Sequence, residues 1–409
     1  MAERLPLFAT TSRGTERLLA AELETLGAKK VRQGRGGVYF MANLDEAMRL
    51  IVHSRLAMRV LYPLGEFEAP GAEGLYEAAA QVAWEEWLTV KSTFAVEASL
   101  TNSEHTHSGF VALKIKDGIV DRMRKVKGER PDVDTHSPDV QVVAHLNKTK
   151  LSLSLDLCGD PLFKRGYRIK TTPAPLKETL AAAVLLASGY DGTEALADPM
   201  CGSGTIVIEA GYIATNRPPG LKRHFAVERW PSLGEKATAL LDEVKKEAHG
   251  SLRAATVPIF AYDRDEEAIE AVTRNVMAAG LSTVIRIETA DAVYNAPPEG
   301  VTPGLICTNP PYGDRLTAGG QKGMKTFYFQ LGNGMNRWAG WRMSFLSGNS
   351  AFESAFHHRP INRTPLFNGP IECTLLEYGP QPVKHVESEP LGPANPVTPV
   401  ETDEPESSG

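Results

Sequence analysis

The chain has 409 residues, of which 42% are hydrophobic and 23% charged, with a net charge of −6; these proportions exclude global disorder and are typical of a globular protein of about two or three domains. No apolar run approaches the roughly 18–20 residues that span a bilayer, and the N-terminus lacks the hydrophobic segment of a secretory signal. The four cysteines lie far apart without a CxxC pair, so we expect a cytoplasmic protein with no disulfide scaffold, no metal site and no membrane contact.

The first 160 residues alternate between short strand and helix patterns. In residues 1–65 we expect strands at 5–9, 37–41 and 59–68, and helices at 14–26 and after the capping residue Asn43. In residues 66–160 we expect a helix at 75–88, a strand at 93–100, an amphipathic helix at 110–126, and a hairpin of 139–146 and 150–157. The patterns predict a small α+β unit over 1–65, followed by a compact module over 66–160.

A linker at residues 161–174 leads into regularly alternating helices and strands that run to residue 380. The expected strands are 194–198, 257–262, 284–288, 304–308 and 342–347, with helices at 178–188, 204–215, 266–279 and 327–338 and a closing antiparallel pair at 363–367 and 373–378. This order predicts an α/β, doubly wound, Rossmann-like sheet with a ligand at the carboxyl ends of its strands. Residues 381–409 hold six prolines and a net charge of −5, which predicts a disordered acidic tail.

Two stretches are basic although the chain as a whole is acidic. Residues 113–130 contain seven basic and three acidic residues, and residues 161–177 contain five basic residues and no acid. Local patches of this kind, and not the overall charge, determine whether a protein attracts nucleic acid. Each stretch taken alone is equally compatible with an ordinary solvated face.

A glycine-rich turn follows the strand at 194–198 and opens the next helix. It consists of Asp198, Pro199, Met200, Cys201, Gly202, Ser203, Gly204 and Thr205. The glycines let the backbone approach a ligand closely, and the helix N-terminus offers free N–H groups to a carboxylate or phosphate. The turn matches neither the GxGxxG pattern nor the P-loop pattern, and by itself any tight turn can look like this.

Two aspartates stand at the ends of the next two expected strands. Asp263 is placed to accept hydrogen bonds from both hydroxyls of a ribose, whereas Asp265 is placed to cap the following helix. Asp291 can contact an adenine amino group or serve as an ordinary turn residue. Asp263 lies 65 residues after Asp198 instead of the usual interval of about 20, and an inserted segment near 218–250 accounts for the excess.

The sequence Asn309-Pro310-Pro311-Tyr312 after the strand at 304–308 is the most informative motif. Two prolines fix φ at both positions and end the strand, which makes a rigid platform. The Asn309 amide oxygen and the Pro310 carbonyl can accept both N–H bonds of a planar exocyclic amine, while Tyr312 can stack on the base. The motif therefore predicts a catalytic group that holds such an amine for attack on an electrophilic methyl group.

Together these residues resemble the class I S-adenosylmethionine-dependent amino methyltransferases. In this resemblance residues 198–205 are the first cofactor motif, Asp263 the ribose acid, Asp291 the adenine contact and residues 309–312 the target-amine motif. Residues 10–14 (TTSRG), 163–168 (FKRGYR), 175–183 (PLKETLAAA) and 309–316 (NPPYGDRL) are similar to THUMP-containing RNA methyltransferases, most strongly to the bacterial 23S rRNA guanine-N2 enzymes.

The resemblance implies a ferredoxin-like domain at 1–65, a THUMP domain at 66–160 and a catalytic domain at 175–380. It implies S-adenosylmethionine as cofactor, with Thr179 among its contacts, and methyl transfer to guanosine N2 in RNA, either 23S rRNA or a large-subunit assembly intermediate. A monomer is favoured. The RNA-binding residues are expected on the basic helix and the linker: Lys114, Lys116, Arg122, Arg124, Lys125, Lys127, Lys164, Arg165, Arg168 and Lys170.

Several alternatives accompany this interpretation. Some relatives carry a second methyltransferase domain, and since the chain passes into the acidic tail we expect only the guanine-N2 activity, with Asp314 as a candidate acceptor of the amine proton. The tRNA guanine-N2 enzymes share the motifs but usually lack the Lys-Glu-Thr of 177–179, which favours rRNA. The basic front half disfavours a DNA adenine-N6 methyltransferase. The complete ligand set disfavours a non-catalytic RNA-binding or ribosome-assembly factor, and the spacing of the glycines disfavours a nicotinamide oxidoreductase.

Overall fold

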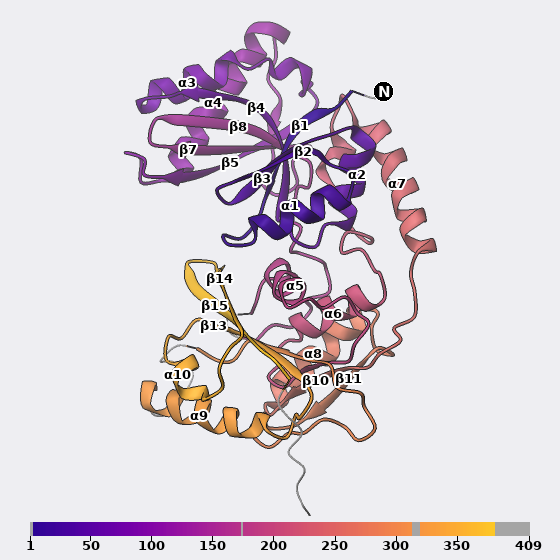
Figure 1. The fold of residues 1–409 in the computed structure, drawn as a ribbon. Coiled ribbons are helices and arrows are strands. Elements are labelled where there is room, and N and C mark those ends of the chain that lie inside the picture. The colour runs from indigo at the N-terminus through magenta and orange to yellow at the C-terminus, as the bar shows by residue number, and fades with distance from the viewer. Residues whose placement is uncertain (1–2, 173–174, 313–319, 381–409) are drawn as a thin grey trace, which may run out of the picture.

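The computed structural model describes residues 3–172, 175–312 and 320–380, which form two bodies, one built mainly by the N-terminal half and one by the C-terminal half (Figure 1). The tail expected at 381–409 and the candidate proton acceptor Asp314 lie outside these residues. Among the helices of the described residues, none combines the length and the apolar character needed to cross a membrane.

The N-terminal body is built on one continuous eight-stranded sheet. The strand order is β2-β3-β1-β4-β8-β7-β5-β6. The strands are β1 (Leu5–Thr10), β2 (Lys29–Gly34), β3 (Gly37–Ala42), β4 (Arg59–Glu68), β5 (Thr93–Thr101), β6 (Asp132–Val133), β7 (Val140–Asn147) and β8 (Lys150–Asp156). Strand β4 pairs with β1 on one side and β8 on the other, so the sheet continues across residue 65 without a break.

The helices of this body are α1 (Glu16–Thr25), α2 (Leu44–His53), α3 (Gly71–Gln81) and α4 (Ser108–Lys127). Asn43 caps α2 as predicted, in a capping box with Glu46. The single helix expected at 75–88 is wrong, because α3 ends at Gln81 and a short 3₁₀ helix, η1 (Trp84–Glu86), follows. The turn between them lets the fully buried Trp84 donate its indole N–H to the Ala79 carbonyl at 2.7 Å.

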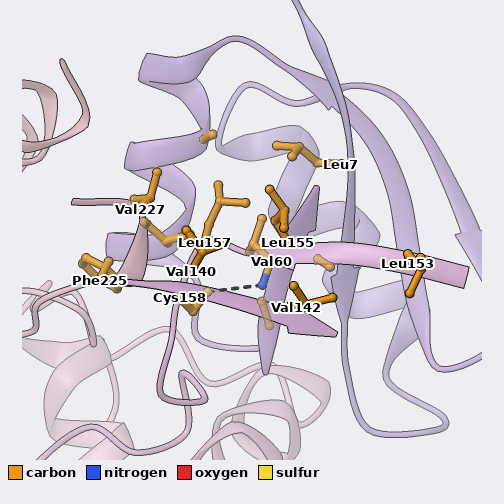
Figure 2. Close-up of a cluster of buried hydrophobic side chains, with 14 of the residues drawn as sticks. Leu7, Val60, Val140, Val142, Leu153, Leu155, Leu157, Cys158, Phe225 and Val227 are labelled. Carbon is orange, nitrogen blue, oxygen red and sulfur yellow. Dashed lines mark hydrogen bonds between the residues drawn. The ribbon is translucent and has the colours of Figure 1, made fainter. Parts of the chain in front are cut away.

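The inserted segment near 218–250 joins the core of the N-terminal body, although it lies in the sequence between strands of the other body. It contains η2 (Ala226–Arg229) and α7 (Gly234–Gly250), and α7 packs against α2 (Figure 1). Phe225 and Val227 lie in the same hydrophobic cluster as Val60, Val140 and Leu157 (Figure 2). A segment of the C-terminal half therefore completes the core of the N-terminal body, so the two bodies are not independent domains joined only by a linker.

The C-terminal body contains a seven-stranded sheet of order β11-β10-β9-β12-β13-β15-β14. The strands are β9 (Leu196–Asp198), β10 (Ile259–Asp263), β11 (Ile285–Thr289), β12 (Leu305–Thr308), β13 (Arg342–Ser347), β14 (Asn362–Asn368) and β15 (Ile371–Tyr378). The first five are parallel, and β15 and β14 close the sheet as the expected antiparallel pair. This is the predicted doubly wound architecture.

Two helical layers cover this sheet. Alternate strand residues point to opposite faces, so Leu196 and Ala197 belong to different hydrophobic clusters. One cluster includes side chains of α5 (Glu178–Ala187), α6 (Thr205–Ala214) and α8 (Glu266–Ala279), and the other includes side chains of α9 (Gly320–Met335) and α10 (Phe352–Phe356). Chain order reverses between β9 and β12, which is where such sheets open a binding crevice.

Candidate active site

A cavity of about 780 Å³ lies at the carboxyl ends of β9, β10, β11 and β12. Its volume is in the range of sites for small molecules and cofactors. It brings together most of the residues predicted from the motifs: Asp198, Pro199, Met200, Cys201, Gly202, Ser203, Thr205, Asp263, Asp291, Asn309, Pro310, Pro311 and Tyr312. Gly204 and Thr179 are not among its lining residues.

The two glycines of the turn after β9 are required by backbone geometry. Gly202 has a φ of +52° and Gly204, which precedes α6, a φ of +85°, both in the left-handed region. A Cβ atom on Gly204 would lie 2.4 Å from Cγ2 of Val272 in α8. Gly204 thus has a packing role behind the cavity, whereas Gly202 lies on its wall.

Two carboxylates accept hydrogen bonds from backbone N–H groups of this turn. Asp263 accepts the Gly202 N–H at 2.9 Å, and Asp198 accepts the Met200 N–H at 3.1 Å. Burial raises the pKa of Asp198 to about 7, and the nearby Asp263 charge adds to the effect. Asp265 caps α8 by accepting the Glu267 N–H at 3.0 Å, which confirms the role expected for Asp265, while ribose binding by Asp263 stays a prediction.

Asp291 lies on the far side of the cavity, in the turn after β11. Its carboxylate accepts the Val293 N–H at 2.9 Å and lies 3.7 Å from the Arg264 guanidinium. The hydrogen bond makes Asp291 a turn residue, and its place on the cavity wall also lets it meet a ligand. A carboxylate has about four lone-pair positions, so the first role does not prevent the second.

The Asn-Pro-Pro-Tyr platform is fixed by three residues that the motif analysis did not identify. Tyr328 of α9 donates its hydroxyl proton to the Pro311 carbonyl at 2.8 Å. Asn368 of β14 donates to the Tyr312 hydroxyl at 2.7 Å. Gly348 leaves room for the Tyr312 ring, because a Cβ there would lie 2.9 Å from Cδ2 of that ring. These partners are 17 to 56 residues away in sequence, where no local signal points to them.

The amide oxygen of Asn309 is a buried hydrogen-bond acceptor that the described part of the site leaves unsatisfied. Oδ1 is buried and has no hydrogen-bond partner among the described residues. A buried acceptor without a partner costs about 1–3 kcal/mol, which a folded protein recovers when a ligand supplies the donor. A ligand that places an N–H or O–H group at this point of the cavity would satisfy the Asn309 oxygen.

Comparison with known proteins agrees with this architecture. Residues 165–377 match the family described as "RMKL-like, methyltransferase domain", residues 71–156 match the THUMP domain, and residues 6–61 match the RlmL ferredoxin-like domain. The chain belongs to the RMKL-like methyltransferase family.

Two curated relatives of this chain have the same name. "Ribosomal RNA large subunit methyltransferase K/L" of Syntrophotalea carbinolica is 40% identical over 91% of this chain and 53% of the relative, and that of Psychromonas ingrahamii is 38% identical over 98% and 53%. The chain thus spans about half the length of the curated relatives it matches.

Solved structures show the same fold along the chain. SMU.472, solved in complex with SAH, has a TM-score of 0.83 and 29% identity, with 94% of this chain and 100% of that one covered. A protein from Clostridium difficile 630 also gives a TM-score of 0.83, at 30% identity, with 93% and 99% covered. SAH is the demethylated form of S-adenosylmethionine, the cofactor on which this methyltransferase family depends.

The residues around the cavity fit S-adenosylmethionine. The Cα of Gly202 can be approached by a ligand, since a Cβ there would contact only Thr172 Oγ1, at 3.5 Å. Asp263 keeps lone pairs for ribose hydroxyls beyond the bonds it accepts from the N–H groups of Gly202 and Asp265. Thr179 is different: it is buried in the first turn of α5 with no partner for Oγ1 among the described residues, so a direct cofactor contact by Thr179 stays a prediction.

The linker arginines of this family member have partners inside the fold. The burial of Arg165 argues against its expected contact with RNA, whereas RNA contact by the partly exposed Arg168 stays a prediction. Arg165 is 5% exposed and pairs with the buried Glu209 at 3.4 Å. Arg168 donates to the Glu178 carboxylate at 2.9 Å and to the hydroxyls of Ser203 and Thr205 at 3.1 Å each. Composition identified the positive charges, but their partners depend on tertiary structure.

Asn275 of α8 completes this support and was missed by the motif analysis. Its Oδ1 accepts the N–H groups of Ile169 and Lys170, and its Nδ2 donates to the carbonyls of Lys170 and Ser203 at 2.8 and 2.9 Å. The fully buried amide therefore holds the linker against the glycine-rich turn. The sequence signal was weak, because an asparagine within an amphipathic helix looks like a surface residue.

The other cationic residues expected to bind RNA stand at the surface of the N-terminal body and the linker. On α4, Arg124, Lys125 and Lys127 are exposed, whereas Arg122 is ion-paired with Glu85. On the linker, Lys164 and Lys170 pair with Asp160 and Glu270, at 2.7 and 2.6 Å. Surface pairs of this kind are weak and can exchange for a phosphate, and contact of these residues with RNA stays a prediction.

Proposed function

We propose that this chain transfers the methyl group of S-adenosylmethionine to the exocyclic N2 amine of a guanosine in 23S rRNA. The observation that carries the proposal is the buried, unpartnered Oδ1 of Asn309, set beside the Tyr312 ring in the same cavity as Asp198 and Asp263. The name shared by the curated relatives supports ribosomal RNA as the substrate.

The side chains of the platform suit an aromatic amine. Such an amine is a poor nucleophile because its lone pair is delocalised into the ring. The Asn309 Oδ1 atom and the Pro310 carbonyl accept its two N–H bonds and favour a more tetrahedral nitrogen, while the Tyr312 ring stacks on a base turned out of its helix. When bound, S-adenosylmethionine supplies an electrophilic methyl group, and the remaining contribution of the chain is orientation and exclusion of water.

The THUMP-matching region would hold the RNA that delivers this base. Residues 71–156 carry that match, and α4 within it presents exposed lysine and arginine side chains. Contacts of cationic side chains with phosphates position an RNA and make its affinity depend on salt, without reading sequence directly.

The test is methylation by the purified chain with labelled S-adenosylmethionine, followed by nucleoside mass spectrometry. Protein-free 23S rRNA, bulk tRNA and genomic DNA are offered separately. We expect N2-methylguanosine in 23S rRNA, its loss in Asn309→Ala with RNA affinity retained, and full activity in Asn336→Ala, which removes an exposed amide in the turn after α9, outside the cavity.

Each other outcome refutes a definite part of the proposal. N2-methylguanosine in tRNA alone would make tRNA the substrate instead of rRNA. N6-methyladenine in DNA alone would make adenine the target base and DNA the substrate. Retained turnover in Asn309→Ala would remove the platform from catalysis. No methylation together with no binding of S-adenosylmethionine in calorimetry would leave a non-catalytic RNA-binding role.

A further inference from the structure

A second cavity, of about 740 Å³, lies at the beginning of the linker. It is lined mainly by three segments far apart in sequence: the loop at 135–138, residues 158–167 where β8 leads into the linker, and residues 217–229 at the start of the inserted segment. The cavity therefore exists only because the inserted segment docks on the N-terminal body. We call it the insertion cleft.

The insertion cleft is strongly basic. Seven arginine or lysine side chains line it against a single carboxylate, that of Asp160. Four of the seven have acidic partners: Arg59 pairs with the buried Asp156 and Arg165 with the buried Glu209, whereas Lys164 and Arg229 pair with Asp160 and Asp139 at 2.7 and 3.8 Å. For Arg217, Lys222 and Arg223 the described residues provide no ion pair, so the cleft keeps an excess of positive charge in a chain whose overall charge is −6.

Some of these cations are held in fixed positions. Arg223 donates to the carbonyls of Pro161 and Asp160 at 2.8 and 2.7 Å, which orients its guanidinium without neutralising it. The Nε atom of Arg217 is buried without a hydrogen-bond partner among the described residues. Lys222 is exposed at the rim. Oriented, unneutralised guanidinium groups are suited to the oxygens of phosphate.

The insertion cleft and the catalytic cavity are neighbours along the linker. A smaller hollow of about 480 Å³ shares Lys164 and Gly166 with the insertion cleft and shares Pro175 and Leu176 with the catalytic cavity. Phe163 lines this hollow, with the Lys177 ammonium 5.1 Å from the centre of its ring. The path thus combines cationic groups with an aromatic face, the equipment of a groove for single-stranded nucleic acid.

We propose that the insertion cleft binds the phosphodiester backbone of the RNA strand whose guanosine enters the catalytic cavity. The inference rests on the proposed function, since it takes the substrate to be RNA. The hollow between the insertion cleft and the catalytic cavity favours the substrate strand as occupant over an acidic protein, because a strand bound in the cleft can extend along the linker to the Asn309 platform.

The test measures the binding of fluorescently labelled fragments of protein-free 23S rRNA at a series of salt concentrations. The variants are Lys164→Gln, Lys222→Gln and their combination, both at exposed positions, and the matched control is Lys246→Gln on the exposed face of α7. Each lost phosphate contact on a single strand lowers the slope of log affinity against log salt by about 0.7. Over a fourfold rise in salt, wild type should lose about sevenfold more affinity than the double variant.

The same variants separate this proposal from the proposed function. We expect the double variant to raise KM for RNA while kcat and the affinity for S-adenosylmethionine stay at wild-type values. Wild-type slope and affinity in the double variant, in a protein that binds and methylates RNA, would overturn the insertion cleft as an RNA site and leave the proposed function standing. RNA binding with the expected loss of slope, but without methylation in wild type, would overturn the proposed function and retain the cleft. Failure of the wild-type chain to bind RNA would overturn both.

Discussion

The assignment of Arg168 to the interior of the fold gives a sharp prediction. Replacing it by Met removes the partner of the Glu178 carboxylate, whose side chain is 6% exposed and whose pKa is raised by burial, against the lowering effect of Arg168. Removing one partner of a buried ion pair costs about 3–5 kcal/mol. Because 21% of the Arg168 side chain remains exposed, we expect a smaller loss of unfolding free energy, about 2–3 kcal/mol.

The cost should fall when the unpaired carboxylate is also removed. In Arg168→Met/Glu178→Gln the buried charge is absent, so the double variant should be more stable than the sum of the single effects predicts. Urea unfolding measures this cycle, and Lys170→Met is its control, since it breaks only the exposed pair with Glu270, worth at most about 1 kcal/mol.

Two further measurements decide between an internal role and RNA contact for Arg168. Loss of its bonds to Ser203 and Thr205 should loosen the glycine-rich turn and lower the affinity for S-adenosylmethionine in calorimetry. The salt dependence of RNA binding should stay at the wild-type slope. A stable Arg168→Met variant with normal cofactor affinity and a slope reduced by about 0.7–0.9 would refute the reasoning.

Three other predictions follow from single residues of the site. Because burial raises the folded-state pKa of Asp198 to about 7, above its unfolded value near 3.9, its contribution to stability is fully present below about pH 4 and is lost as pH rises through 7. Asp198→Asn should remove the part of this loss that falls between pH 5 and 8, roughly 2–3 kcal/mol, in urea unfolding of the cofactor-free chain at these two pH values. Gly204→Ala should lower the free energy of unfolding by about 2–3 kcal/mol, because the residue has a positive φ and its new Cβ would lie 2.4 Å from Val272. Adding Val272→Ala should relieve only the steric part of this loss, as measured by thermal unfolding. Gly348→Ala should displace the Tyr312 ring and lower kcat for methyl transfer while cofactor affinity is retained; unchanged kcat would show that the ring position is unimportant.

The parts of the fold that could be predicted from sequence are those specified by local patterns. The Asn43 capping box, the β7–β8 hairpin and the parallel strands of the C-terminal body each have a periodic or capping signal within a few residues. Strand β2 was missed because its residues are mostly exposed and polar, and only pairing with β3 makes it a strand. Helix α9 begins at Gly320 and not near 327, because its first turn lacks an apolar face.

The candidate site likewise contains residues that could be predicted from local sequence patterns and residues that could not. Asp198, Asp263 and Asn309 follow strands, so the rule that ligands gather at the carboxyl ends predicts their convergence from sequence. Tyr328, Gly348 and Asn275 act through distances of a few ångströms across the fold, and single-sequence patterns carry no information about such pairs. The positive charge of Arg165 was visible, but its neutralisation by Glu209 depends on the burial of α6.

The interface between the two bodies fixes the position of any bound RNA relative to the catalytic cavity. Arg165 donates to the Arg55 carbonyl at 2.6 Å and pairs with Glu209, while the Arg55 guanidinium donates to the Tyr212 carbonyl at 3.2 Å. Separating the bodies would leave these buried charges without partners, at a cost of several kcal/mol, and would also expose the shared core around Phe225. Rigid-body hinge motion at the linker is therefore strongly opposed. On the proposed function, a guanosine would have to reach Asn309 by deformation of the RNA and not by closure of the protein.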